Sequence, residues 1–303
     1  MSDRYKRILK QIHAGVPVLI DGATGTEVER RGVRKIDNAW NAGGVLSDPE
    51  VVQEIHEDYI RCGARIIISN TFATHKSALQ EAGEGEHFRA YNRRSVELAC
   101  AARDELAAEH VLVAGGLSHW SFTGRKPPLE ALRDDAKEQA HIMADAGAEL
   151  LLLEMMSEID RLLAVLDGAK STGLPVWPGL SCQLDEHSIP ILLDGEPLAE
   201  AVGALRDKDV DFINIMHTNV EHVSACLDVL DQGWHGPVGV YAHSGKYNDN
   251  LDLDFDTVIS EQSYCDYVHD WLARSVVLVG GCCGIGPTHM RKLADSGSFS
   301  GVG

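Results

Sequence analysis

Short apolar, β-branched runs recur along the whole chain and alternate with longer segments of helical periodicity. Each run has the length of one buried strand, and each intervening segment has room for a covering helix. This alternation is typical of βα units around a parallel sheet. Eight runs fit the pattern, at 18–20, 65–68, 111–114, 149–153, 176–180, 210–215, 238–241 and 276–279.

Polar side chains stand directly after most of these runs, among them Asp21, Ser69, Glu154 and His243. In a closed (β/α)8 barrel the carboxyl ends of all strands converge on one face, where active sites lie. A doubly wound sheet would separate several of these residues. The sequence therefore predicts an α/β fold, a single (β/α)8 TIM barrel with parallel strands, as one domain over residues 1–303.

The connecting segments carry helix and loop signals. A helix is predicted to begin at Asp48, with Pro49 in its first turn, and to end at Gly63. Two long polar segments, 184–197 and 244–256, follow the fifth and seventh strands. Loops of that length at the carboxyl ends of barrel strands are predicted to be active-site loops.

The net charge of the chain limits the kinds of partner that it is expected to bind. The chain has 27 Lys and Arg against 46 Asp and Glu, a formal net charge of −19. This charge repels phosphate backbones and anionic lipids, so neither nucleic acid nor a membrane is an expected partner. No apolar run has the length of a membrane span or a secretory signal. We expect a cytoplasmic enzyme that acts on small molecules, and homo-oligomer formation stays open.

The segment Gly-Gly-Cys-Cys-Gly near the carboxyl end is the sharpest chemical signal. Seven cysteines, two of them adjacent, indicate thiols or metal ligands rather than a disulfide framework. Flanking glycines let the backbone turn, so that Cys282 and Cys283 can present both sulfur atoms to one metal ion. His217, after the sixth strand, is the nearest third ligand, and Cys182 and His243 are reserves. Three protein ligands with an open fourth position are typical of catalytic zinc.

Other roles for these residues stay open at this point. Vicinal cysteines also occur as small buried apolar residues, and a histidine at a strand end can be structural or can contact substrate. Asp21 and Glu154 are expected inside the barrel mouth, where a buried negative charge needs a cation or hydrogen-bond donors. A substrate ammonium group would meet that need. The alternatives are a salt bridge, a helix N-cap or, for Asp21, a turn.

Several segments resemble the homocysteine S-methyltransferase family, across nearly the whole chain. DGATGTEVERRG at 21–32 is similar to its opening motif, and HEDYIRCGARIIISNTFATH at 56–75 is similar to its second strand and Asn-Thr-Phe turn. GGCCGIGPTHM at 280–290 resembles its terminal motif, and Glu154 matches its fourth-strand glutamate. The resemblance implies a barrel that binds Zn²⁺ through three cysteines and transfers a methyl group to the thiol of homocysteine.

Site residues follow from the resemblance by position. It implies that Asp21 and Glu154 bind the amino group of homocysteine. It further implies that Gly22 and Thr71 contact the amino acid, at its carboxylate. These four form the expected substrate-binding set.

The family's third zinc ligand is replaced in this chain. That cysteine usually stands in Asn-Cys-Thr-x-Pro at the sixth strand, where this sequence reads Met-His-Thr-Asn-Val with the histidine at position 217. The expected catalytic and metal set is therefore His217, Cys282 and Cys283. A neutral imidazole in place of a thiolate removes one negative charge from the centre.

The expected function is a zinc-dependent transfer of a methyl group from a small onium donor to homocysteine, giving methionine. S-methylmethionine, S-adenosylmethionine and a betaine are the candidate donors. One alternative is a paralogue that acts on another thiol or a methylated amine, marked by His217; another is a non-catalytic binding protein that keeps the barrel. Aromatic faces for the donor cation are sought among Trp120, His75, His119, Trp177 and Tyr241.

Overall fold

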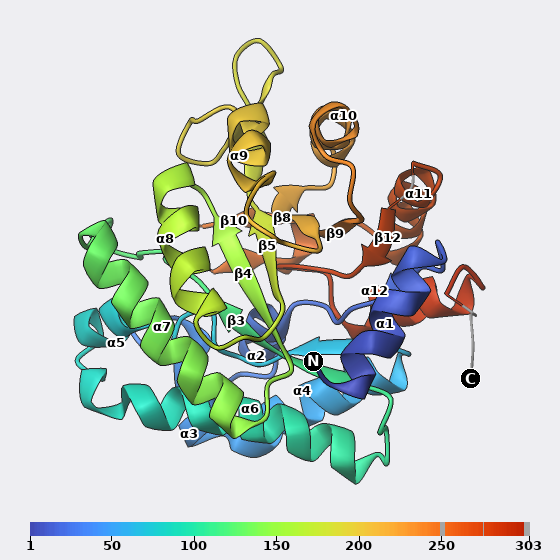
Figure 1. Ribbon diagram of the computed structural model, residues 1–303. Coiled ribbons are helices and arrows are strands. Elements are labelled where there is room, and N and C mark those ends of the chain that lie inside the picture. Colours follow the sequence, from blue (N-terminus) through green and yellow to red (C-terminus); the bar gives the residue numbers. More distant parts are fainter. Residues whose placement is uncertain (249–251, 275, 300–303) are drawn as a thin grey trace.

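The computed structural model describes residues 1–248, 252–274 and 276–299. Within these ranges eight parallel strands form one sheet, in the order β1-β12-β9-β8-β5-β4-β3-β2. A parallel bridge between Ile20 and Ile66 joins the two outer strands, so the sheet closes and the predicted barrel is confirmed (Figure 1). The strands are β1 (Val18–Leu19), β2 (Ile66–Ile68), β3 (Leu112–Leu117), β4 (Leu150–Met156), β5 (Val176–Leu180), β8 (Ile213–Asn219), β9 (Val238–His243) and β12 (Val276–Val279).

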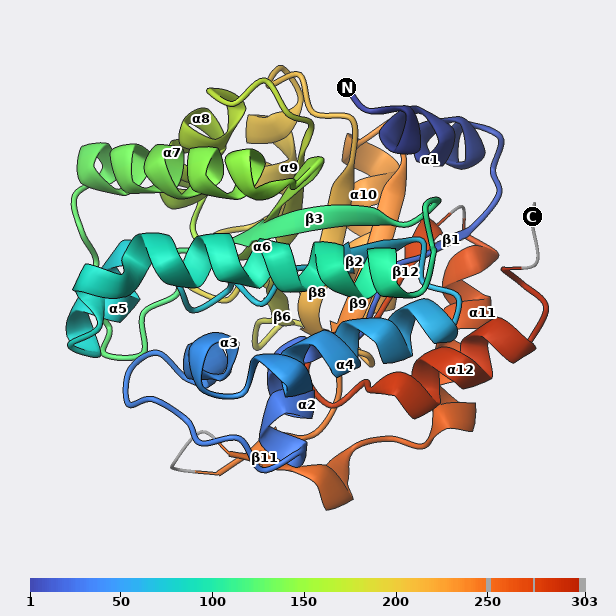
Figure 2. The same ribbon diagram turned by 90° about the horizontal axis from the view of Figure 1, so that it is seen from below.

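Helices cover the outside of the barrel, and Figure 2 shows α4, α6 and α7 following one another along it. The strands they cover are buried on both faces, as parallel strands are. The covering helices are α2 (Thr24–Arg30), α4 (Pro49–Arg61), α6 (Phe88–Glu105), α7 (Leu129–Ala146), α8 (Ile159–Lys170), α9 (Leu198–Leu205), α10 (Val223–Gly233), α11 (Glu261–Leu272) and α12 (Pro287–Asp295). The connections also contain α3 (Gly44–Ser47), α5 (Lys76–Glu81) and 3-10 turns at Asn41–Gly43, Gly85–His87 and Phe255–Thr257. No described helix combines the length and apolar character needed to span a membrane.

The predicted helix after position 48 is α4, which begins at Pro49 as expected. Gly63 follows its end with φ of 96°, a conformation that favours glycine. Asp48 occupies the N-cap position, but its side chain accepts no capping hydrogen bond. Its carboxylate instead accepts a 2.6 Å hydrogen bond from Ser47 Oγ.

The two long segments predicted as active-site loops contain short antiparallel strands. One carries β6 (Cys182–Leu184) paired with β7 (Pro190–Leu192), and the other carries β10 (Lys246–Tyr247) paired with β11 (Leu253–Asp254). Residues 249–251 of the second predicted loop lie outside the described residues. Strands of two or three residues leave too short an alternation to be recognised in a sequence.

Helix α1 (Asp3–His13) closes the end of the barrel where the strands begin. Its Tyr5 is fully buried, and Trp177 Nε1 donates a 3.2 Å hydrogen bond to its hydroxyl. The Trp177 ring in turn stacks on Phe212, with ring centroids 4.6 Å apart. Trp177 therefore packs at the closed end of the barrel, away from the open end where a donor cation was expected to meet it.

Acid should weaken the fold through His56, which lies on α4 with neither ring nitrogen hydrogen-bonded in the described structure. Burial lowers the pKa of His56 from its ordinary 6.5 to about 4. The unfolded chain therefore binds the extra proton first, and stability that is present above pH 6.5 is lost as the pH falls towards 4. We expect a loss of about 3 kcal/mol over this window. Urea unfolding of wild type and His56→Leu across this range checks it, since the variant should lose that part of the pH dependence.

Candidate active site

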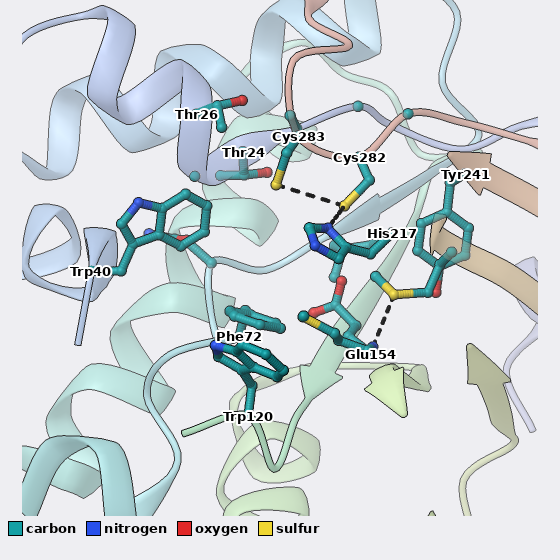
Figure 3. A pocket seen from close by; sticks show the side chains of 18 of the residues that line it. Thr24, Thr26, Trp40, Phe72, Trp120, Glu154, His217, Tyr241, Cys282 and Cys283 are labelled. Atoms are coloured by element: carbon teal, nitrogen blue, oxygen red, sulfur yellow. Dashed lines mark hydrogen bonds between the residues drawn. The ribbon is translucent and has the colours of Figure 1, made fainter. Parts of the chain in front are cut away.

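A cavity of about 320 Å³ opens at the carboxyl ends of the strands. Segments from β1, β2, β3, β4, β5, β8, β9 and β12 or the loops after them contribute to its wall, as expected for the catalytic face of a barrel. Figure 3 shows its interior. Its lining consists of Gly22, Ala23, Thr24, Gly25, Thr26, Trp40, Ile68, Ser69, Asn70, Phe72, Trp120, Phe122, Glu154, Met155, Leu193, Met216, His217, Tyr241, Tyr247, Gly281, Cys282 and Cys283.

His217, Cys282 and Cys283 come together in this cavity, as the sequence predicted. One ligand atom from each lies within 4.8 Å of the others, and this is the one such group of His, Cys, Asp or Glu found among the described residues. Cys282 Sγ lies 3.5 Å from His217 Nδ1 and 3.9 Å from Cys283 Sγ (Figure 3). Soft thiolates with an imidazole are a donor set that suits zinc and related metals.

The reserve ligands fall outside this cluster. Cys182 is buried and hydrogen-bonds with the thiol of Cys226, which helps to raise the pKa of Cys182 well above its usual value. His243 instead packs against His217, with the two ring centroids 4.6 Å apart. Burial lowers the pKa of His243 to about 4, so its imidazole is neutral at physiological pH.

The strand pairing is irregular at two strand ends that contribute residues to the cavity wall. The pairing of β8 with β9 shifts register between Met216 and Asn219, and His217 within this bulge has φ of 43°. The pairing of β4 with β5 shifts between Leu153 and Met156, where Met155 has φ of 56°. Positive φ is costly for side chains of this size and persists where the surroundings impose it, often at functional sites.

Glycines place the two cysteines. Gly284 has φ of 84°, and a Cβ there would lie 2.3 Å from the carbonyl oxygen of Ser244. The turn is tied to β9, since Cys282 N donates to Ala242 O at 2.8 Å and Ser244 N donates to Cys283 O at 3.1 Å. The glycine-flanked pair thus depends on close backbone approach, as the sequence indicated.

The two thiols differ in proton affinity. A hydrogen bond from Cys282, followed by one with His217, lowers the pKa of Cys283 well below its usual value. The same contact with Cys283, followed by burial, raises the pKa of Cys282. Of the two thiols, Cys283 is therefore the easier to ionise, and its thiolate would favour a cation beside it.

Asp21 and Glu154 are buried carboxyl groups at the same end of the barrel. Asp21 Oδ2 accepts a 2.7 Å hydrogen bond from Ile68 N, while Oδ1 has no partner in the described structure. Burial raises the pKa of Asp21 well above its usual value, and the charge of Glu154 adds to it. Burial and then the charge of Cys283 raise the pKa of Glu154 to about 8. Two such carboxyl groups attract a positively charged group.

Of the other two expected substrate contacts, the structure brings Gly22 to the cavity but not Thr71. A Cβ at Gly22 would lie 2.5 Å from Ile285 O, so only glycine fits there. Thr71 is fully buried outside the lining. Its hydroxyl donates to Gly116 O at 2.8 Å and accepts from Gly116 N at 3.0 Å. Thr71 thus joins the loop after β2 to β3 and does not offer its hydroxyl to a ligand.

Several aromatic residues of the cavity were missed or misplaced from sequence. Of the five residues considered as donor contacts, Trp120 and Tyr241 line the cavity and the others do not. Trp40, Phe72 and Phe122 line it without having been considered. Phe72 could have been predicted from the sequence, because it stands in the Asn-Thr-Phe turn after the second strand. Trp40 could not, because the region around it carries no strand or helix signal.

Fold and cavity together define a barrel enzyme with a cluster of soft candidate metal ligands in its cavity, and comparisons with known proteins identify it as an S-methyltransferase. The family model for homocysteine S-methyltransferase matches residues 18–296, so the chain belongs to that family. The homocysteine S-methyltransferase of Escherichia coli (strain K12) is 30% identical over 306 residues, which cover 91% of this chain and 94% of that protein. A selenocysteine Se-methyltransferase of Brassica oleracea var. italica is 25% identical, covering 95% and 90%.

The solved structures include a metallated relative. The crystal structure of the homocysteine methyltransferase MmuM from Escherichia coli in its metallated form matches with a TM-score of 0.80 and 25% identity. The match covers 97% of this chain and 100% of that one. A metal in that relative is consistent with the His217, Cys282 and Cys283 cluster of this chain.

Proposed function

We propose that this protein transfers a methyl group from a small onium donor to the thiol of homocysteine, giving methionine, with zinc held by His217, Cys282 and Cys283. The observation that carries the proposal is the cluster of two sulfurs and one imidazole within 4.8 Å, open to a cavity that the buried carboxyl group of Glu154 also lines. Asp21 lies outside the lining, close enough for the charge of Glu154 to act on it. The residues fit the metal, because soft donors already lie together and the pKa of one of them, Cys283, is lowered. A zinc ion there would make an incoming thiol nucleophilic at neutral pH.

The chain's own residues hold the acceptor. Burial disfavours the charged forms of the Asp21 and Glu154 carboxyl groups, and Asp21 Oδ1 lacks a hydrogen-bond partner in the described structure. An ammonium group between them would supply both charge and donors. It would also favour the ionised form of each carboxyl group. Gly22, next to Asp21 in the chain, lines the cavity there.

The opposite wall holds the donor. Trp40, Phe72 and Trp120 gather on one side of the cavity, across from the cysteines (Figure 3). Aromatic faces attract a sulfonium or quaternary ammonium ion. As the acceptor sulfur bonds to the methyl carbon, the donor's bond to that carbon breaks, its electron pair stays on the donor, and the thiol proton leaves to solvent. Holding both reactants in line, about 3–3.5 Å apart, is the barrel's contribution to the rate.

Mass spectrometry of the products tests this function. The purified protein is loaded with zinc and given homocysteine with methyl-labelled S-methylmethionine, S-adenosylmethionine or a betaine. Labelled methionine supports the proposal. Bound zinc with product only from another thiol or from a methylated amine supports a paralogue of different specificity. No turnover of any of these acceptors would support a binding protein.

His217→Cys should bind zinc at least as tightly as wild type and react severalfold faster with an alkylating donor. The substitution adds a negative charge to the ligand set, which makes a bound thiol more electron-rich. Zinc content and alkylation rate are the measurements. His222→Cys, which adds a thiol outside the cavity lining, is the control. Unchanged zinc affinity and rate in His217→Cys would show that the imidazole is not a ligand.

A further inference from the structure

The aromatic wall of the cavity is built from separate loops. Phe72 belongs to the loop after β2, and Trp120 belongs to the loop after β3. Trp40 packs edge-on against Phe72, with ring centroids 6.2 Å apart. A cation is held well only when it lies within about 6 Å of a ring centroid, so the wall works only if the loops are fixed relative to one another.

The loop after β2 is anchored to helices α6 and α7 by buried side-chain hydrogen bonds. Thr74 Oγ1 donates a 2.7 Å hydrogen bond to Asn92 Oδ1, and Asn92 Nδ2 donates back to Thr74 O at 2.9 Å. Gln139 Nε2 donates to the same Asn92 oxygen at 2.8 Å. All three side chains are buried, so α6 and α7 hold this loop through a closed network that rigidifies it.

His75 follows this anchor directly and reaches across to the other loop. Its Nε2 lies 2.7 Å from Trp120 O, a carbonyl, which requires Nε2 to donate. Its Nδ1 accepts from Ala78 N at 3.4 Å and lies 3.0 Å from Ser77 Oγ, which then donates to it. The neutral tautomer protonated at Nε2 satisfies all three contacts at once. The ring is 5% exposed, so water does not compete for these bonds.

Apart from the bond to His75, the Trp120 backbone makes one hydrogen bond within the part of the chain that the structure describes. Its N–H donates to Ser118 Oγ at 3.1 Å, a contact within the same loop. The other bonds from this loop to separate elements start three or more residues further along the chain. Thr123 donates to Glu81 at 2.6 Å, and Pro127 O accepts from Arg161 at 2.9 Å. Lys126 pairs with Glu158 at 2.8 Å and with Asp194 at 3.4 Å. His75 therefore joins the anchored loop after β2 directly to the backbone of Trp120.

We propose that His75 is a positioning residue that fixes Trp120 over the cavity and thereby sets the affinity for the onium donor. The inference rests on the proposed function, since it assigns the aromatic wall to the donor. His75 touches neither reactant. It acts by fixing the angle of the Trp120 ring.

Kinetics of two matched variants test the proposal. His75→Asn keeps an acceptor at the place of Nδ1 and loses the reach to Trp120 O, whereas His75→Gln keeps the reach. We expect His75→Asn to raise the KM for the donor about tenfold, with kcat and the KM for the thiol near wild type. His75→Gln should restore most of the donor affinity. An unchanged donor KM in His75→Asn, or equal increases for donor and thiol, would overturn the proposal.

Fluorescence separates this inference from the proposed function, because it needs no methyl transfer. Acrylamide should quench the tryptophan emission of His75→Asn more than that of wild type. The difference should vanish when Trp120→Phe is added to both proteins. A quenching difference without turnover would leave the positioning role standing and refute the methyl transfer. An absent or Trp120-independent difference would refute the positioning role itself.

Discussion

Cys282→Ser is expected to lose its zinc and to lower methyl transfer at least ~100-fold. Serine places a protonated, hard hydroxyl where a soft sulfur lay 3.5 Å from His217 Nδ1 and 3.9 Å from Cys283 Sγ. Two remaining ligands rarely hold zinc against solvent and buffer. Metal content by mass spectrometry and initial rates measured at saturating zinc give the two readouts.

The matched control for this variant is Cys182→Ala. That thiol was a reserve ligand on sequence grounds, but it contacts Cys226 and lies outside the cluster. It should keep wild-type zinc content. If Cys282→Ser retained stoichiometric zinc and full activity, the assignment of the cluster would be wrong, and so would the role of zinc in generating the nucleophile.

Glu154→Gln is expected to lower kcat/KM for homocysteine roughly 100-fold while leaving zinc content unchanged. The carboxyl group is buried and lies against Gly116, where a Cβ would come within 2.1 Å of Glu154 Oε2. The amide keeps this shape but cannot neutralise an ammonium group. The loss should therefore appear in acceptor binding, and it is measured by varying homocysteine at fixed donor.

A thiol that lacks the amino group provides the comparison. Wild type should turn this thiol over far more slowly than homocysteine. Glu154→Gln should narrow that difference in rate, because wild type distinguishes the two thiols by the ammonium group that Glu154 binds. Asp21→Asn should act in the same direction, since the charge of Glu154 reaches Asp21 and one ammonium group could therefore meet both carboxyl groups. Equal losses for the two thiols in Glu154→Gln would place the carboxyl group in a purely structural role.

The eight strands could be predicted from the chain because each contains a short apolar run and most of these runs are followed by a polar residue. Both features are local, and burial on two faces imposes the first of them. The cysteine pair was recoverable for the same reason, since Gly280 to Gly284 are contiguous in sequence. His217 was recoverable by its place after a strand. The short pairs β6–β7 and β10–β11 were not, because two or three residues show no period.

Residues whose role depends on a distant partner were beyond sequence reasoning. Thr71 stands in the expected motif, yet its hydroxyl is taken up by Gly116, 45 positions away. Trp177 was an aromatic candidate for the donor, but α1 and Phe212 enclose it at the closed end of the barrel. His75 was a candidate for contact with the donor and instead holds the loop that carries Trp120.

By itself the sequence determined the barrel, the end at which its polar residues gather, and the cysteine pair with His217 as its neighbour. These follow from hydrophobic period, glycine placement and position after a strand, which are properties of a few consecutive residues. Only the tertiary structure decided which carboxyl groups lack partners, which aromatic rings face the cavity and how two loops are tied together. Those properties depend on contacts between side chains that are far apart in the sequence, and no short stretch of the chain contains both partners.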